Sequence, residues 1–415
     1  MRKHPTAIVL GGTSPHIALI ENLKTRGYYT VLVDYLENPP ARNAADEHIR
    51  ESTLDQDKVL KLARTIDARL VISTCVDQAN VTACYVAERL GLPAPYSYET
   101  ALNVTNKILM KKMMIESGIP TSRFVIAKSF ADFENQELRF PVIVKPADSC
   151  ASTGVKKAFT PSEVEIFLND ALGLSRTNGA VVEEFNEGRE FSVYGFVKEK
   201  KVHLILIAQR ITTIDGSGRV MLCYATVAPA EITEKLEYQI QECADKIAAS
   251  FDLNNTPIHI QVITNGDEID VIEFAPRVGG GFSYKTIKLG TGFDIINAAV
   301  DSYLNIKTNI EYKKPDSVFA INLIYATPGI FDRIEGYGEL IENNTILGLF
   351  DHKTRGSRIC SDRASSSRVG AILVEGKSRH ELLAKIEHAV TRMEVYDSNG
   401  KRIMRKDLYL KNTDL

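Results

Sequence analysis

The sequence predicts a mixed α/β and α+β protein made of several packed units. Up to Pro93, short apolar strands alternate with helices, which is the pattern of a parallel, doubly wound sheet. Residues 258–274 carry two apolar runs on either side of the turn Asn265-Gly266-Asp267, which indicates a β-hairpin. Beyond residue 312, strand-like runs precede a helix-forming stretch at 378–393, which is typical of a small α+β unit.

The composition is ordinary for a globular protein. The 415 residues are 44% hydrophobic and 25% charged, which suffices for roughly two to four packed units. The net charge of −3 gives no basic field, so nucleic-acid binding is not expected. No apolar run is long enough to span a membrane, and the N-terminus becomes glycine-rich too early for a secretory leader. We therefore expect a cytoplasmic protein without a membrane partner.

The cysteines are scattered along the chain: Cys75, Cys84, Cys150, Cys223, Cys243 and Cys360. They lack the C-x-x-C spacing of zinc sites, and their contexts do not indicate a disulfide framework. For most of them the sequence favours a buried structural role.

The N-terminal elements follow one another in βαβ order. Strands are expected at 6–10, 30–33 and 70–73, and helices at 17–26, 55–66 and 80–90. The turn Gly11-Gly12-Thr13-Ser14 lacks the glycine spacing of a dinucleotide-binding loop, so a structural βα turn is favoured over a dinucleotide site. Thr13 and Ser14 still provide donors for a small anionic substrate at the strand ends, and Asp34 and Asp77 share that edge.

The hairpin at 258–274 brings two oxygen-bearing side chains together. Gln261 and Glu273 are expected near each other on paired strands, and Arg277 and three glycines follow. Magnesium prefers oxygen ligands and accepts phosphate oxygens for the rest of its shell, while arginine can bind a phosphoryl group bidentately. A surface hairpin with an ordinary acidic residue is an equally good interpretation of this stretch taken alone.

Two lysines precede a loop of small residues. Lys107 begins a helix, and Lys145 lies in the apolar strand 140–147, which leads into a loop at 148–155 whose backbone amides can cover phosphates. The loop is not a P-loop, because the lysine precedes it. Lys145 needs an anionic partner if it is buried, whereas Lys111 and Lys112 are expected on a solvated helix face.

Four segments together resemble the ATP-grasp superfamily in order and spacing. They are Lys107, KPADSCASTG, VVEEFNEGREFSV and IEFAPRVGGG. The resemblance covers about residues 104–292 and looks most like the carboxylate–amine ligases related to L-amino-acid ligases and to halves of carbamoyl-phosphate synthase. It implies a pre-ATP-grasp Rossmann-like domain at 1–104, an ATP-grasp domain at 105–311 with a mobile lid at about 121–187, and a C-terminal α+β domain at 312–415.

The resemblance also implies a role for individual side chains. Lys107 and Lys145 would contact the α- and β-phosphates of ATP, and Glu190 would accept from the ribose hydroxyls. The residues implied to cover the phosphates are Ser149, Ser152, Thr153 and Gly154. The residues implied beside the adenine are Glu183, Glu184 and Phe185.

The remaining implied roles concern metal and phosphoryl transfer. Gln261 and Glu273 would hold Mg²⁺, Arg277 would stabilise the transferring phosphoryl group, and Arg210 would be a cation for the γ-phosphate, although an ordinary strand arginine is nearly as good an interpretation. Most relatives carry glutamate at the position of Gln261, and many carry asparagine at that of Ala275. One or two Mg²⁺ ions are therefore expected, with Mn²⁺ as a substitute.

The function implied is an ATP- and Mg²⁺-dependent carboxylate–amine ligase that forms an acyl phosphate and releases ADP and phosphate. Its expected partners are ATP, a small carboxylate and a small amine, with a homodimer as a candidate assembly. Two alternatives stay open. One is a biotin-carboxylase-like or carbamoyl-phosphate-forming enzyme that uses bicarbonate, and the other is a nucleotide-binding regulator without turnover.

Overall fold

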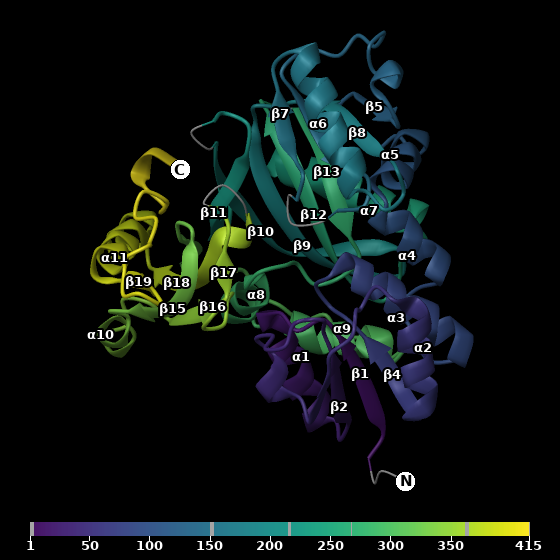
Figure 1. Cartoon of the computed structure of the whole chain (residues 1–415), viewed down its shortest axis with the longest axis vertical. Helices are drawn as coiled ribbons and strands as arrows, with labels where there is room; N and C mark the ends of the chain where they lie inside the picture. The colour runs from purple at the N-terminus through teal and green to yellow at the C-terminus, as the bar shows by residue number, and fades with distance from the viewer. Residues whose placement is uncertain (1–3, 150–152, 215–216, 267, 362–364, 415) are drawn as a thin grey trace.

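The computed structural model describes residues 4–149, 153–214, 217–266, 268–361 and 365–414. Its strands form sheets of four, eight, three and four strands. Figure 1 shows the N-terminal unit at the bottom, a small sheet capped by α6 at the top, and the C-terminal residues to the left. The α/β and α+β class predicted from the sequence is confirmed.

The N-terminal sheet is parallel throughout, with strand order β3-β2-β1-β4. Its strands are β1 (Thr6–Leu10), β2 (Tyr29–Val33), β3 (Glu47–Ile49) and β4 (Ala68–Ile72). Its helices are α1 (Ser14–Thr25), α2 (Gln56–Thr65) and α3 (Asp77–Leu90). The apolar strands β1 and β4 are almost entirely buried, as in sheets covered on both faces. The sequence interpretation missed β3 and α4 (Tyr98–Thr105).

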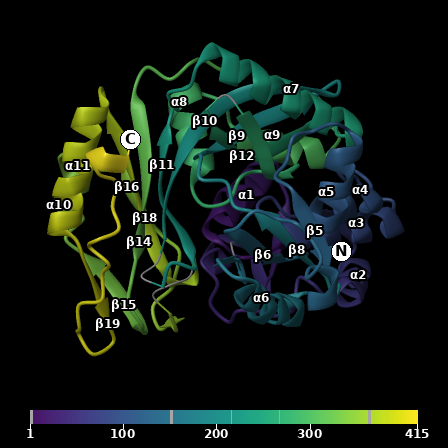
Figure 2. The same ribbon diagram turned by 90° about the horizontal axis from the view of Figure 1, so that it is seen from above.

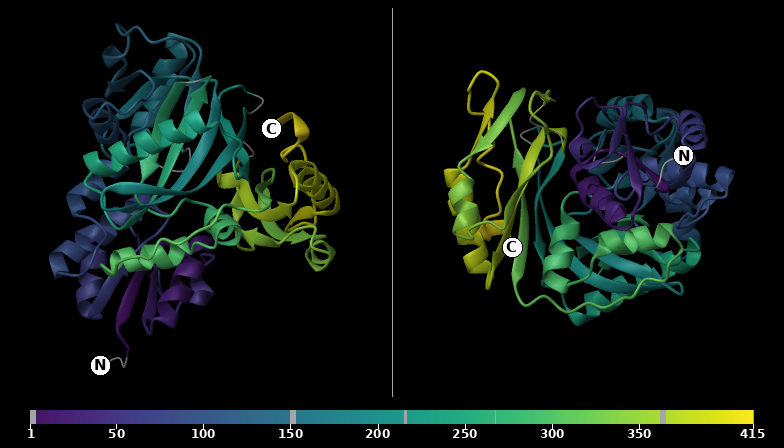
Figure 3. Two further views of the ribbon diagram at one scale, coloured as in Figure 1. Left: turned by 180° about the vertical axis from the view of Figure 1, so that it is seen from behind. Right: turned by 90° about the horizontal axis from the view of Figure 1, so that it is seen from below.

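A helix from much later in the chain packs against this unit. Helix α9 (Ile295–Tyr303) contributes to the same hydrophobic core as β1 and β4, and it lies beside α1 and β1 in Figures 1 and 3. Arg26, the C-cap residue of α1, forms an ion pair of 2.7 Å with Asp301, and the Tyr303 hydroxyl donates to Asn80 Oδ1 at 2.7 Å. These contacts fix the N-terminal unit against the segment that follows the predicted hairpin.

The second four-stranded sheet, formed by residues 124–184, has the order β5-β8-β6-β7 and is antiparallel. Its strands are β5 (Phe124–Ala127), β6 (Val142–Pro146), β7 (Lys156–Ala158) and β8 (Ala180–Glu184). Helix α6 (Pro161–Leu174) packs Val164 and Leu168 against β6, and α5 (Lys107–Glu116) lies beside β8. The sheet lies inside the range predicted for the lid.

The eight-stranded sheet is antiparallel, in the order β13-β12-β9-β10-β11-β14-β18-β16. Its strands are β9 (Arg189–Lys198), β10 (Lys201–Ile214), β11 (Met221–Ala228), β12 (Thr256–Asn265), β13 (Glu268–Ala275), β14 (Val318–Tyr325), β16 (Gly348–Asp351) and β18 (Arg368–Gly376). Helix α7 (Glu234–Ser250) packs on the β9–β12 part, and α8 (Ser283–Thr291) follows β13. The predicted hairpin is confirmed as β12 and β13.

The C-terminal elements complete one end of this sheet. Figure 2 shows α11 (Arg379–Arg392) on the outer side of β14 and β18. The remaining elements are β15 (Gly329–Glu335), β17 (Arg358–Ile359), β19 (Glu394–Asp397) and α10 (Gly338–Glu342). Within the described ranges, no helix is long and apolar enough to cross a membrane.

Candidate active site

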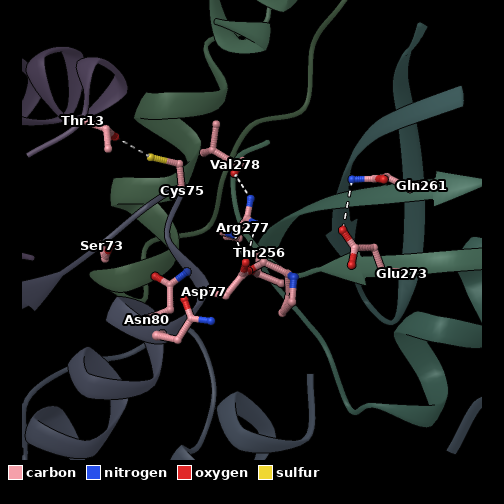
Figure 4. Close-up of polar contacts among 12 residues, drawn as sticks. Thr13, Ser73, Cys75, Asp77, Asn80, Thr256, Gln261, Glu273, Arg277 and Val278 are labelled. Atoms are coloured by element: carbon pink, nitrogen blue, oxygen red, sulfur yellow. Dashed lines mark hydrogen bonds and ion pairs between the residues drawn. The ribbon is translucent and has the colours of Figure 1, made fainter. Parts of the chain in front are cut away.

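Gln261 and Glu273 lie opposite each other on β12 and β13. Gln261 Nε2 donates to Glu273 Oε1 at 3.2 Å (Figure 4). Glu273 Oε2 lies 3.6 Å from Lys107 Nζ. The described residues contain no cluster of three or more His, Cys, Asp or Glu side chains that could hold a metal. Two adjacent oxygen donors still fit magnesium, because that ion takes few protein ligands when phosphate oxygens and water supply the rest.

Lys107 joins this pair to the start of the small-residue loop. It begins α5, where the Asn106 side chain caps the helix by accepting from the N–H groups of Ile108 and Leu109. Lys107 Nζ donates to the carbonyl oxygen of Ser149 at 2.7 Å. One cation therefore contacts both the loop and the candidate metal ligand.

The loop is held at both of its described ends. The Ser149 hydroxyl donates to the carbonyl oxygen of Thr153 at 2.8 Å. Gly154 has a φ of +74°, and a Cβ there would approach Leu174 to 2.7 Å, so glycine is required. Ser152, which the sequence placed over the phosphates, lies outside the described residues.

A buried cluster of three charges lies beside the loop. Lys145 Nζ donates to Glu183 Oε1 at 2.5 Å, and Lys111 Nζ lies 2.7 Å from Glu183 Oε2. The expectation that Lys111 faces solvent is wrong, because its face of α5 packs towards β8 and leaves it 1% exposed. Lys112 is exposed, as expected. This arrangement leaves two lysines sharing one carboxylate.

The protonation of this cluster follows from burial and charge. Burial lowers the pKa of Lys145. Burial alone would raise the pKa of Glu183, but Lys111 and Lys145 outweigh it and lower that pKa to about 2. Glu183 is therefore a carboxylate at neutral pH, and it pairs with Lys145, which the sequence assigned to phosphate binding, and with Lys111.

The residues that follow Glu183 turn away from this cluster. The Glu184 side chain lies 3.5 Å from Arg123 and accepts from the Arg139 N–H at 3.0 Å. The Phe185 ring lies under Lys157 Nζ at 3.5 Å, a cation–π contact. The roles of Glu183, Glu184 and Phe185 beside an adenine remain predictions.

Arg210 and Glu190 form an ion pair across neighbouring strands. The two residues are register partners on β9 and β10, and Arg210 Nε lies 2.6 Å from Glu190 Oε1. Both side chains are largely buried. The ion pair joins Glu190, which the resemblance implies beside the ribose, to Arg210, which it implies beside the γ-phosphate. Both roles remain predictions.

Arg277 is held by Asp77, a residue from the N-terminal unit. Its Nε and Nη2 donate to the two carboxylate oxygens of Asp77 at 2.6 and 2.8 Å, and Nη1 donates to the carbonyl oxygen of Val278 at 2.8 Å (Figure 4). Burial acts to raise the pKa of Asp77, but Arg277 outweighs it and lowers that pKa. The sequence placed Asp77 at the strand edge but did not identify it as a partner of Arg277.

The glycines after Arg277 allow close packing beside it. A Cβ at Gly279 would lie 2.7 Å from the Tyr194 ring, so that position has no space for a side chain. The Tyr194 ring stacks on His259 with centroids 5.1 Å apart. Burial, and then Arg277 and Arg210, lower the pKa of His259 to about 3, so this imidazole is neutral.

The chain is similar in sequence to several known proteins. Residues 138–285 match the ATP-grasp domain family. The L-arginine-specific L-amino acid ligase of Bacillus subtilis is 23% identical over 293 residues, which are 69% of this chain and 67% of that protein. The carbamoyl phosphate synthase large chain of Pseudomonas aeruginosa is 25% identical over 293 residues, which are 67% of this chain. This chain spans only 27% of that synthase subunit.

The similarity extends to solved structures. The L-amino acid ligase of Bacillus licheniformis superposes with a TM-score of 0.80 at 21% identity, covering 96% of this chain and 100% of that one. At this identity the superposition establishes the fold.

Proposed function

We propose that this chain, whose residues 138–285 match the ATP-grasp domain family, is an ATP-dependent ligase that joins a carboxylate to an amine. In the proposed reaction the carboxylate attacks the γ-phosphate of ATP, giving an acyl phosphate and ADP. The amine then displaces phosphate and forms a carbon–nitrogen bond. The observation that carries the proposal is Lys107, which contacts both the small-residue loop and Glu273.

The proposed chemistry depends on positioning and charge rather than on a nucleophilic side chain. Phosphoryl transfer is accelerated mainly by aligned groups and by neutralisation of the phosphate oxygens. Lys107 supplies positive charge for the phosphates, and Lys145 and Lys111, which share the single carboxylate of Glu183, add one net positive charge. A magnesium ion held by Gln261 and Glu273 would add charge neutralisation when bound.

Arg277 is the proposed group for the transferring phosphoryl and for the oxyanion formed during amine attack. Its guanidinium is already oriented by two hydrogen bonds to Asp77. A donor held in place before the reaction needs little reorganisation as charge develops. Asp77 and Arg277 together therefore support catalysis at the junction of the N-terminal unit and the hairpin.

A hydroxylamine trap tests the ligase mechanism directly. The enzyme is incubated with ATP, Mg²⁺ and a panel of carboxylates, and ADP and hydroxamate are measured together. We expect both products to rise in parallel for the true carboxylate, because hydroxylamine attacks an acyl phosphate. ADP release that requires bicarbonate alone would instead indicate a carboxylating enzyme. ATP binding without turnover for any substrate would indicate a regulator.

Replacing Lys145 with methionine is expected to weaken ATP binding about 10- to 100-fold, the scale of one charged hydrogen bond. The fold should survive, because Glu183 keeps Lys111 as a partner. Isothermal titration calorimetry with ATP and Mg²⁺ measures the effect. Lys112→Met is the matched control, since that lysine is exposed on α5. Equal affinities of the two variants would exclude Lys145 from the site.

A further inference from the structure

A cysteine and a histidine meet where ligands bind in open α/β sheets. In the order β3-β2-β1-β4, strands β2 and β3 lie on one side of β1, and the next strand along the chain, β4, lies on the other side. Such a reversal opens a crevice at the carboxyl ends of β1 and β4. Thr13 and His16 follow β1, and Cys75 follows β4, so all three lie at this crevice.

The Cys75 thiol contacts two polar side chains from the other side of the crevice. Its Sγ lies 3.5 Å from Thr13 Oγ1, and 3.7 and 4.0 Å from His16 Nδ1 and Nε2 (Figure 4 labels Thr13 and Cys75). His16 is fully buried, while Cys75 is partly exposed. Cys75 is therefore partly accessible to solvent as a residue, whereas His16 is enclosed.

The imidazole of His16 is fixed in its orientation. Its Nδ1 lies 2.9 Å from Thr13 Oγ1, and its Nε2 lies 3.5 Å from Ser73 Oγ. A Cβ at Gly11 would come within 3.1 Å of the ring, and Gly11 has a φ of +98°, so only glycine leaves room for it. An oriented, water-excluded imidazole is well placed to keep a proton beside a thiolate.

The charges around the pair favour the ionised form. Burial acts to raise the pKa of Cys75, but His16, Thr13 and Arg277 outweigh it and lower that pKa to about 7. Burial acts to lower the pKa of His16, but Cys75 and then Asp34 outweigh it and raise that pKa. Among the described residues, Asp77, which pairs with Arg277, and Tyr284 on α8, whose own pKa is raised mainly by burial, also lie near these elements.

We propose that Cys75 and His16 form a thiolate–imidazolium pair that makes Cys75 a covalent modification site for low-molecular-weight disulfides. The thiolate attacks one sulfur of the disulfide, a new S–S bond forms, and the original S–S bond breaks. The other half leaves as a thiolate and takes a proton from water. Excess thiol reverses the exchange by the same steps.

The location of Cys75 gives the adduct a consequence for the ligase. Asp77, two residues further along the chain, holds Arg277, so a mixed disulfide on Cys75 would add bulk beside the Asp77–Arg277 pair, although Cys75 itself forms no hydrogen bond with either of these described residues. We expect it to inhibit turnover, and this part rests on the proposed function. The thiol reactivity itself does not.

Alkylation rates measured from pH 5.5 to 9.5 test the reactivity independently of ligase activity. The folded protein is treated with limiting iodoacetamide, and each cysteine is followed by peptide mass spectrometry. Cys75 is expected to react half-maximally near pH 7. Cys360, which is exposed, is the internal control. His16→Gln should slow the reaction of Cys75 at pH 7 about tenfold and shift its midpoint towards the ordinary thiol value of about 8.5.

Thr13→Val provides a second variant in case His16→Gln does not fold, and it is expected to shift the midpoint of the alkylation rate upward by a smaller amount.

Oxidised glutathione should add one glutathione to Cys75 of the wild type, with reversal by dithiothreitol. Cys75→Ser should keep ligase activity and resist the inhibition. Reaction of Cys75 at pH 7 no faster than that of Cys360 would overturn the proposal. A fast-reacting Cys75 in a protein without hydroxamate formation would uphold it while removing the proposed function.

Discussion

Replacing Arg277 with lysine is expected to lower kcat about 100-fold while nucleotide affinity stays close to that of the wild type. Lysine keeps the positive charge but loses the planar fork that Asp77 orients through two hydrogen bonds. Loss of one oriented transition-state donor has effects of this size. The variant should also fail to accumulate hydroxamate in the trapping assay. Steady-state kinetics and calorimetry, compared side by side, separate kcat from binding.

Arg26→Lys is the matched control for this substitution. Arg26 also pairs with an aspartate, Asp301, at an interface between the N-terminal unit and a later helix, but it lies outside the candidate site. Its replacement should leave kcat nearly unchanged. Full activity of the Arg277→Lys enzyme would remove Arg277 from catalysis, and a loss confined to KM would make it a binding residue.

Replacing Glu183 with glutamine should lower the free energy of unfolding by about 3–5 kcal/mol, the range measured when one partner of a buried ion pair is removed. Two buried lysines would lose their shared carboxylate. Urea unfolding at pH 7 measures the change. Glu184→Gln, whose partners Arg123 and Arg139 are exposed, should change stability by less than about 1 kcal/mol.

The pH dependence of stability provides a second measure of the same cluster. The pKa of Glu183 is lowered in the folded protein to about 2 from an ordinary value of 4.5. Its contribution to stability is therefore complete above the ordinary value and is lost as the pH falls from about 4.5 towards 2. Over this window the wild type should lose more stability than Glu183→Gln does. Parallel losses in the two proteins would contradict the buried ion pair.

Local patterns in the sequence were sufficient to predict much of the fold. The period-2 runs around the Asn265–Gly266 turn predict β12 and β13. The turn alone would pair Gln261 with Ile272, and a β-bulge between Gln261 and Val262 places Gln261 opposite Glu273. The continuous apolar runs near Ile8 and Val71 predict a parallel sheet for a different reason, because the strands of such a sheet are buried on both faces. The short strand β3 has no fully buried residue, so it carries no apolar pattern by which it could be recognised.

The error at Lys111 could have been avoided. Lys107 and Lys111 are four residues apart and therefore share one face of α5, whereas Lys112 is rotated away from that face. Assigning Lys107 to the site already implied that Lys111 points in the same direction. Adjacent lysines in a helix are not equivalent in exposure.

Contacts between distant segments could not be predicted from local patterns. Asp77 and Arg277 are 200 residues apart, and their pairing depends on α9 packing against the N-terminal core. The pairing of Cys75 with His16 likewise depends on β1 and β4 becoming neighbours. Sequence spacing indicates which side chains are suited to a site, but the packing of these elements decides which of them meet.

Strands β14, β18 and β16 belong to the same eight-stranded sheet as β9 to β13, so the C-terminal residues cannot be removed without disrupting that sheet. Strand β14 pairs with β11 from Ala225↔Asn322 to Ala228↔Phe319, and β18 and β16 extend the sheet beyond it. A chain that stopped before β14 would expose the backbone N–H and C=O groups of β11 as an open edge, which favours aggregation with other strands. To complete the sheet again, a separate polypeptide carrying β14 would have to pair with β11 by β-strand addition.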